Sequence, residues 1–129
     1  MDMYVSPQVS LTWRGSFAAA HSLDKHKGKC SALHGHTYHV SIKLVGKILL
    51  EDGMLVDFSA LHAIVDAFDH KHLNGLTEPD PPTAEVLATH ILQAVGAYTE
   101  AEKRLVSGIT VTLSESEHTS VTVYAGIPS

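Results

Sequence analysis

The sequence is short of several features that common protein classes need. A single cysteine, Cys30, excludes an internal disulfide and favours a reducing compartment or a thiol kept for its reactivity. Nine Lys and Arg residues stand against 14 Asp and Glu residues, a formal net charge of −5, so there is no cation excess for a broad nucleic-acid surface. Any anionic ligand must therefore be bound by a local group of cations.

Long hydrophobic runs are also missing. No stretch of 18 apolar residues occurs, and the first residues, MDMYVSPQVS, lack the charged and then apolar regions of a signal peptide. We therefore expect a cytoplasmic protein without a membrane segment. A length of 129 residues leaves no room for a second catalytic domain, so we expect one domain over residues 1–129, or one that packs against copies of itself.

Histidine, by contrast, is abundant. The chain has ten, at positions 21, 26, 34, 36, 39, 62, 70, 72, 90 and 118. Imidazole is the commonest metal ligand in proteins and the side chain that titrates near neutrality. So many histidines in a small domain indicate that several of them belong to a functional site.

The hydrophobic pattern predicts an α+β fold. Residues 9–21 and 34–44 alternate with the period of two that is typical of strands, and Gly15 suggests a bulge in the first. Asp52-Gly53 suits a hairpin tip. Asp57 and Thr83 are each followed by apolar residues at helical spacing, and two further alternating segments, 109–115 and 121–125, complete the order ββααββ. We expect a four-stranded, mostly antiparallel sheet with two helices on one face.

The clearest candidate for a site is His34-Gly35-His36. Two histidines two residues apart on a strand project from the same face, which suits two ligands of one metal ion. His21 has the matching position on the first strand, so the three imidazoles converge if the two strands pair as a hairpin. Three histidine ligands leave a fourth position open, as in catalytic zinc sites. An isolated His-x-His pair is about as often structural, and His21 shifts the balance towards a metal.

Three further residues or pairs carry chemistry with alternatives left open. Cys30, close before His34, is a fourth ligand, a thiolate base or an inert small hydrophobe. In Asp69-His70 the carboxylate can fix the imidazole tautomer. The alternative is that the two residues only mark the polar C-terminal end of a helix. Glu115 continues the apolar face of the strand 109–115, so it needs a partner: a ligand with N–H donors, an arginine, or solvent at the strand end.

Several segments together resemble the 6-pyruvoyltetrahydropterin synthase superfamily. Their order and spacing agree over residues 9–125, and the three-residue gap between Cys30 and the HGH motif resembles the QueD branch, the 6-carboxytetrahydropterin synthases of the queuosine pathway. Two departures stand out: His62 replaces a usual lysine, and ESEHTS is longer than usual at the end of its strand. The matching segments are FAAAH (17–21), CSALHGH (30–36), MLVDFSAL (54–61), FDHKHLN (68–74), PPTAEVLA (81–88) and LSES (113–116).

The resemblance implies a role for each site residue. His21, His34 and His36 are the implied Zn²⁺ ligands, Cys30 the residue that removes a proton, and Asp69 with His70 the acid/base relay. Glu115, or Glu117 if the strand register differs, anchors the pterin ring. Lys25, Lys27 and Lys29 are candidates to contact the triphosphate of the substrate, the alternative being a solvated loop.

The family also implies a reaction and an assembly. In the QueD branch, 7,8-dihydroneopterin triphosphate becomes 6-carboxy-5,6,7,8-tetrahydropterin, acetaldehyde and triphosphate, without a redox cofactor. The alternatives are a pyruvoyl-forming synthase, which keeps the three-carbon side chain, and a non-catalytic zinc- or pterin-binding module. The implied architecture is the tunnel-fold, in which sheets of several subunits join into a barrel, commonly as a hexamer of two stacked trimers with active sites between subunits.

Overall fold

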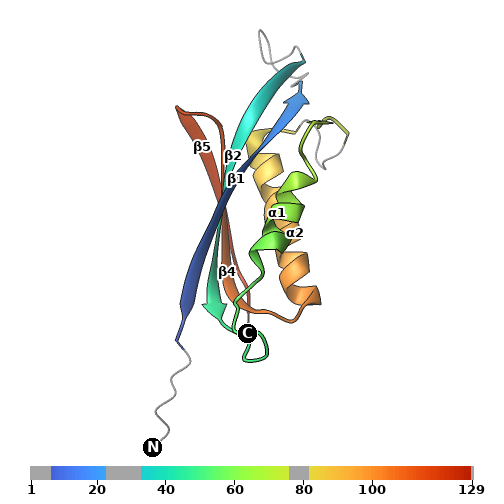
Figure 1. Cartoon of the computed structure of the whole chain (residues 1–129). Helices are drawn as coiled ribbons and strands as arrows, with labels where there is room; N and C mark the ends of the chain where they lie inside the picture. Colours follow the sequence, from blue (N-terminus) through green and yellow to red (C-terminus); the bar gives the residue numbers. More distant parts are fainter. Residues whose placement is uncertain (1–6, 23–32, 76–81, 129) are drawn as a thin grey trace, which may run out of the picture.

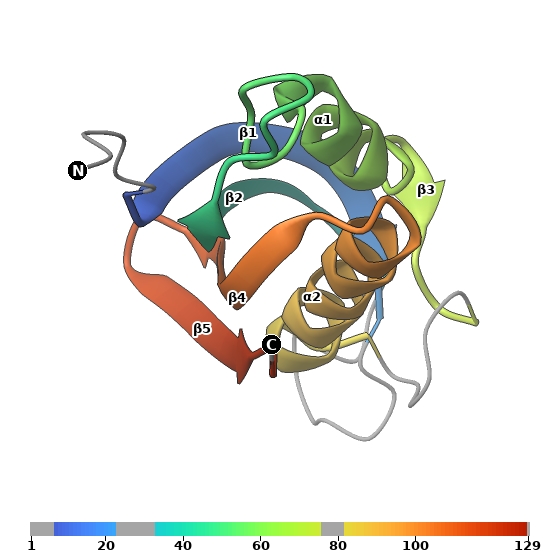
Figure 2. The same cartoon turned by 90° about the horizontal axis from the view of Figure 1, so that it is seen from below.

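A computed structural model describes residues 7–22, 33–75 and 82–128 of the chain. Its sheet has the strand order β3-β1-β2-β4-β5, and both helices lie on the same side of it (Figures 1 and 2). The expected α+β architecture, with helices on one face of the sheet, is therefore confirmed. The elements along the chain are β1 (Val9–His21), β2 (His34–Lys47), α1 (Phe58–Asp66), β3 (Lys71–His72), α2 (Ala84–Ala101), β4 (Leu105–Ser116) and β5 (Thr119–Gly126).

The sheet has a fifth strand that the hydrophobic pattern did not predict. β3 has only two residues, both exposed, and pairs in parallel with Ala19 and Ala20 of β1. Backbone hydrogen bonds, such as that from Leu73 N–H to the Ala20 carbonyl (2.8 Å), hold this segment in place. The other neighbouring strands pair antiparallel, as expected.

The bulge predicted at Gly15 is wrong. β1 and β2 pair without a break from Val9 opposite Gly46 to His21 opposite His34, and Gly15 lies directly opposite Val40. The glycine is explained by sterics, because the indole of Trp13 lies over residue 15 and would collide with a Cβ atom there. Every odd residue of β1 therefore stays on one face along the whole strand.

Both predicted helix starts are confirmed. The Asp57 carboxylate accepts a hydrogen bond from Ser59 N–H (2.9 Å), and the Thr83 hydroxyl accepts one from Val86 N–H (3.2 Å). Phe58, the first apolar residue after Asp57, is the first residue of α1 and is 53% exposed, so it lies outside the buried stripe formed by Leu61 and Val65. The described helices include no segment long and apolar enough to cross a bilayer.

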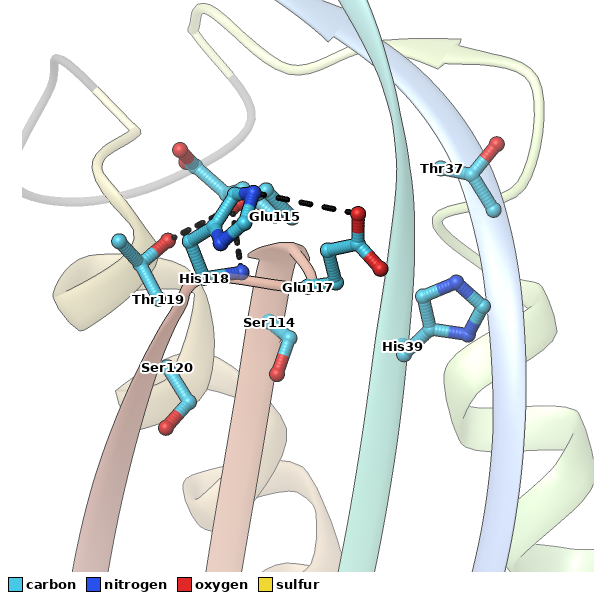
Figure 3. A pocket seen from close by; sticks show the side chains of 9 residues that line it. Thr37, His39, Ser114, Glu115, Glu117, His118, Thr119 and Ser120 are labelled. Atoms are coloured by element: carbon cyan, nitrogen blue, oxygen red, sulfur yellow. Dashed lines mark hydrogen bonds and ion pairs between the residues drawn. The ribbon is translucent and has the colours of Figure 1, made fainter.

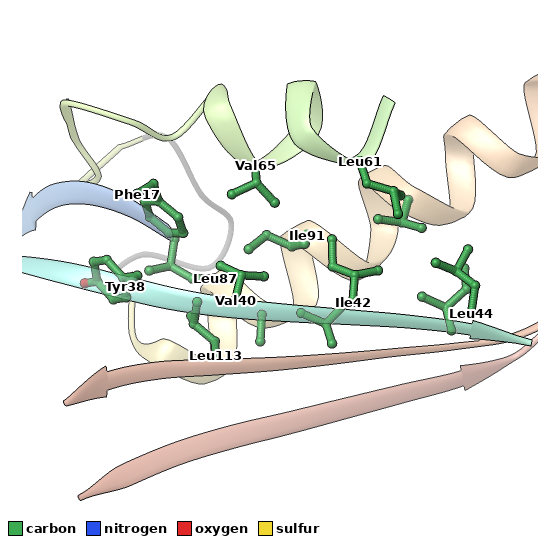
Figure 4. Close-up of a cluster of buried hydrophobic side chains, with 14 of the residues drawn as sticks. Phe17, Tyr38, Val40, Ile42, Leu44, Leu61, Val65, Leu87, Ile91 and Leu113 are labelled. Atoms are coloured by element: carbon green, nitrogen blue, oxygen red, sulfur yellow. The ribbon is translucent and has the colours of Figure 1, made fainter. Parts of the chain in front are cut away.

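The hydrophobic core fills the space between the sheet and the helices (Figure 4). Even-numbered residues of β2 and the odd-numbered residues of β4 from Ile109 to Leu113 point into it, as the alternation predicted. Each buried aliphatic side chain contributes about 1.5–3 kcal/mol by leaving water. The buried residues drawn include Phe17, Tyr38, Val40, Ile42, Leu44, Leu61, Val65, Leu87, Ile91 and Leu113.

A polar clamp closes the end of the sheet away from the histidines. The predicted hairpin tip at Asp52-Gly53 is present: Gly53 has φ +71°, and Leu49 and Met54 form an antiparallel bridge across the turn. Arg104 binds both Asp52 carboxylate oxygens (2.7 and 3.1 Å) and the carbonyls of Met54 and Leu55. The guanidinium hydrogen bonds hold the pKa of Asp52 below its usual value.

Candidate metal centre and acid/base pair

His21 ends β1 on the helix-covered face of the sheet, where the ring is 1% exposed. Its Nδ1 lies 2.9 Å from the Pro82 carbonyl oxygen and 3.2 Å from the Tyr38 hydroxyl. A carbonyl oxygen only accepts, so Nδ1 carries the proton and Nε2 of the neutral ring keeps its lone pair. A second hydrogen bond that orients the ring in this way is typical of histidine ligands of metals.

His36 lies beside His21 across the strand pair. Because β1 and β2 pair antiparallel, His21 faces His34 and Ala19 faces His36. The imidazoles of His21 and His36 are perpendicular, with ring centroids 5.0 Å apart. The hairpin pairing on which the predicted convergence depended is thus present, and the side chain of His34 lies outside the described part of the structure.

Glu115 joins the two histidines from β4. Its Oε1 lies 4.0 Å from His21 Nε2, the ring nitrogen that keeps the lone pair. One ligand atom from each of His21, His36 and Glu115 lies within 4.8 Å of the others. Two imidazole nitrogens and a carboxylate oxygen are a donor set that zinc accepts, so these residues fit a zinc ion. Glu115 therefore lies where it can be a metal ligand as well as a partner for a bound molecule.

Tyr38 is a site residue that no sequence motif indicated. It is fully buried and follows His36 by two residues on the same face of β2. Its hydroxyl contacts the His21 ring. Burial, and then the negative charge of Glu115, raises the pKa of Tyr38 above its ordinary value, so the phenol keeps its proton. The alternation along β2 places Tyr38 on the inward face, which was the available signal. The same pattern is typical of an ordinary core residue.

Glu117 lies in a different environment from Glu115. It is 88% exposed and its carboxylate is 3.8 Å from the His118 ring at the turn between β4 and β5. This pair and Glu115 line a cavity of about 400 Å³ whose other walls include Thr37, His39 and Ser114. Figure 3 shows these side chains. Of the two glutamates, Glu115 is the one that the structure brings to the histidines.

Asp69 and His70 form a pair beside β1. The Asp69 carboxylate lies 2.9 Å from His70 Nδ1 and also accepts a hydrogen bond from Ala18 N–H (2.9 Å). This amide, and to a lesser degree the neighbouring imidazole, holds the pKa of Asp69 below its usual value. Adjacent side chains on a helix point in different directions, but α1 ends at Asp66, before this pair, so the two side chains are free to meet.

The backbone of His70 takes the left-handed conformation, with φ +57°. A residue other than glycine in this region carries strain, which is common at functional sites. The imidazole is 84% exposed, so it is open to a bound molecule or to a neighbouring subunit. Cys30, Lys25, Lys27 and Lys29 lie outside the described residues, and their predicted roles stay predictions.

Comparison with known proteins decides the family. The family model described as 6-pyruvoyl tetrahydropterin synthase matches residues 10–126. The chain belongs to this family. A Bacillus subtilis relative named 6-carboxy-5,6,7,8-tetrahydropterin synthase is 36% identical over 115 residues, which cover 83% of this chain and 78% of the relative. A Halobacterium salinarum relative, named a probable enzyme of the same kind, is 31% identical over 117 residues and covers 77% and 75%.

Solved structures support the fold of this synthase-family chain. The 6-pyruvoyl tetrahydropterin synthase of Caenorhabditis elegans superposes with a TM-score of 0.72 at 25% identity, covering 96% of this chain and all of that one. The tunnel-fold subunit expected from the sequence is therefore confirmed. The chain is an enzyme of this family, and its curated relatives carry the 6-carboxytetrahydropterin synthase name.

Proposed function

We propose that the protein is a zinc-dependent lyase that converts 7,8-dihydroneopterin triphosphate and one water molecule to 6-carboxy-5,6,7,8-tetrahydropterin, acetaldehyde and triphosphate. The names of the curated relatives support this reaction. The observation that carries the metal part is the group of His21, His36 and Glu115, with His21 already held in the tautomer that offers Nε2. His34, directly opposite His21, completes the proposed set of three histidine ligands.

The proposed chemistry needs a metal, a base and an acid. Zinc supplies a Lewis acid that lowers the pKa of nearby substrate hydroxyls. Cys30 removes a proton from the substrate side chain, and His70, oriented by Asp69, returns one at a second atom. The short Asp69–His70 contact supports the second step, because a carboxylate at Nδ1 leaves Nε2 as the nitrogen that exchanges protons.

The triphosphate needs local cations because the whole chain is acidic. Lys25, Lys27 and Lys29 in the segment before Cys30 are the proposed contacts, and ammonium groups bind phosphate oxygens well. In the described part of the structure, the exposed Lys71 of β3 follows His70 directly and adds positive charge beside the proposed acid/base pair.

Glu115 is proposed to anchor the pterin ring. A pterin offers two adjacent N–H donors, and a carboxylate accepts both in a bidentate contact. Glu115→Gln is therefore expected to weaken binding of dihydroneopterin by roughly 1.5–3 kcal/mol, which is about 10- to 150-fold in Kd. The measurement is a titration with dihydroneopterin, alongside a determination of zinc per subunit.

The matched control for Glu115 is Glu117→Gln, which removes an exposed carboxylate two residues away. This control should bind dihydroneopterin like the wild type. The anchor is wrongly assigned if Glu117→Gln loses binding and Glu115→Gln keeps it. Loss of zinc from Glu115→Gln would instead make this carboxylate a metal ligand, which its 4.0 Å approach to His21 Nε2 allows.

The protein is proposed to assemble as a homo-oligomer, a hexamer of two stacked trimers with active sites between subunits. Two features of the described chain support this. β5 forms one edge of the sheet, and among the described residues the segment around β3 covers the edge of β1 from Ala18 to Ser22. This arrangement leaves long strand edges that a second copy can pair with. The exposed His70 is also placed to reach a neighbouring subunit.

The decisive test is product analysis with 7,8-dihydroneopterin triphosphate and the zinc-loaded protein. We expect 6-carboxytetrahydropterin and acetaldehyde in equal amounts. A product that keeps the three-carbon side chain, without acetaldehyde, identifies the pyruvoyl-forming synthase instead. Turnover of neither kind, with zinc and pterin still bound, identifies a binding module.

A further inference from the structure

A row of hydrogen bonds joins the segment after α1 to the end of β1. Asp69 accepts from Ala18 N–H, His70 N–H donates to the Ala18 carbonyl (2.5 Å), and Leu73 N–H donates to the Ala20 carbonyl (2.8 Å). The contacts advance along β1 in steps of two residues. The next step along the strand is Ser22, the residue after His21.

The contact at Ser22 is provided by the side chain of Asn74. Its Oδ1 accepts a hydrogen bond from Ser22 N–H (2.8 Å) and its Nδ2 donates one to the Ser22 carbonyl (2.9 Å). An amide N–H only donates and a carbonyl only accepts, so one orientation of the carboxamide alone satisfies both groups. A single side chain thus replaces the strand partner that β3, which ends at His72, no longer provides.

The position of this contact matters because of what lies on either side of it. His21 precedes Ser22 directly and is the last residue of β1, with His34 opposite it on β2. Asp69 and His70 lie on the same segment as Asn74. The side chain of Asn74 therefore binds the strand that carries a metal-centre histidine, and its backbone belongs to the segment that carries the proposed acid/base pair.

We propose that Asn74 is a positioning residue, which fixes the end of β1 that carries His21 against the segment that carries Asp69 and His70. The roles of those three residues rest on the proposed function, whereas the hydrogen bonds of Asn74 do not. Without Asn74, Ser22 loses two hydrogen bonds to this segment, and the end of β1 beside His21 can fray more easily. Mutation of a residue that hydrogen-bonds a metal ligand directly typically changes metal affinity about 10- to 100-fold. Asn74 acts through the backbone of the residue next to His21, so we expect an effect at the lower end of this range.

The chain offers a matched control at the other end of the sheet. The Arg104–Asp52 clamp also joins segments 52 positions apart by more than one hydrogen bond. It lies away from the histidines, so Arg104→Met should lower the thermal midpoint without changing the metal centre. This variant separates a loss of stability from a loss of positioning.

The experiment uses the full chain and three variants: Asn74→Ala, Asn74→Asp and Arg104→Met. Zinc affinity is measured by competition with a chelator, thermal midpoints by calorimetry, and kcat and KM with 7,8-dihydroneopterin triphosphate. Asp keeps the acceptor for Ser22 N–H and sets a second oxygen against the Ser22 carbonyl. It therefore tests the hydrogen bonds at nearly constant volume, and it carries the test if Asn74→Ala does not fold.

Both Asn74 variants are expected to bind zinc about 10-fold more weakly than the wild type and, once saturated with zinc, to lose kcat more than they raise KM. Arg104→Met is expected to keep the wild-type zinc affinity. The proposal is overturned if the Asn74 variants keep that affinity, if Arg104→Met loses as much, or if the wild type binds no zinc. Absence of the expected product from the wild type would overturn the proposed function alone, because the zinc titration still decides the role of Asn74.

Discussion

A His36→Ala variant is expected to lose its zinc and its turnover together. His36 contributes one of the ligand atoms that lie within 4.8 Å of one another, and alanine offers none. His36 is less buried than His21, whose ring also holds the Pro82 carbonyl and contacts Tyr38. Replacing His36 therefore disturbs the fold less and tests the metal centre more directly.

The measurement is zinc per subunit in the purified protein, together with the rate of product formation. We expect about one zinc in the wild type, almost none in His36→Ala, and a rate lower by several orders of magnitude, since the metal supplies the Lewis acid for the reaction. His39→Ala is the matched control, because His39 lies on the same strand with its exposed side chain on the opposite face. His39→Ala should keep both zinc and activity.

The same measurement on His34→Ala tests the third proposed ligand. His34 faces His21 across the strand pair, so its loss is expected to have the same effect as the loss of His36. One tightly held zinc in His34→Ala would show that this histidine is not needed, and Glu115 would then be the third ligand. Zinc that persists in both variants would contradict the metal centre altogether.

Alternation along the strands was enough to predict much of this centre. In an antiparallel pair with an unbroken register, residues of matching parity stay on one face over any length, so His21 and His36 had to meet once β1 and β2 paired. The same rule brought Glu115 to them from β4. The rule also shows why the bulge assigned to Gly15 was wrong, since a bulge there would have moved His21 to the other face.

The position of the proposed acid/base pair depends on long-range contacts, which no local sequence pattern predicts. β3 has two exposed residues, so there is no hydrophobic alternation to detect, and its position depends on backbone hydrogen bonds to β1. The contact between Asn74 and Ser22 joins residues 52 positions apart through one carboxamide. Motif resemblance placed Asp69, His70 and Asn74 in one segment, whereas the structure shows what this segment is attached to.

Cys30→Ala is expected to keep zinc and lose turnover. The segment before this cysteine carries Lys25, Lys27 and Lys29, and nearby positive charge favours the thiolate, the form that accepts a proton. Loss of a positioned base typically lowers kcat by about 10²- to 10⁴-fold. Zinc per subunit and kcat are measured on the same preparation, and Cys30→Ser serves as a second variant, because a hydroxyl restores the size of the side chain but not its acidity.

A Cys30→Ala protein without zinc would show that the thiolate is a fourth ligand of a closed, structural site. A protein with zinc and undiminished kcat would show instead that the base is another residue, and the exposed His70 beside Asp69 would be the first to test.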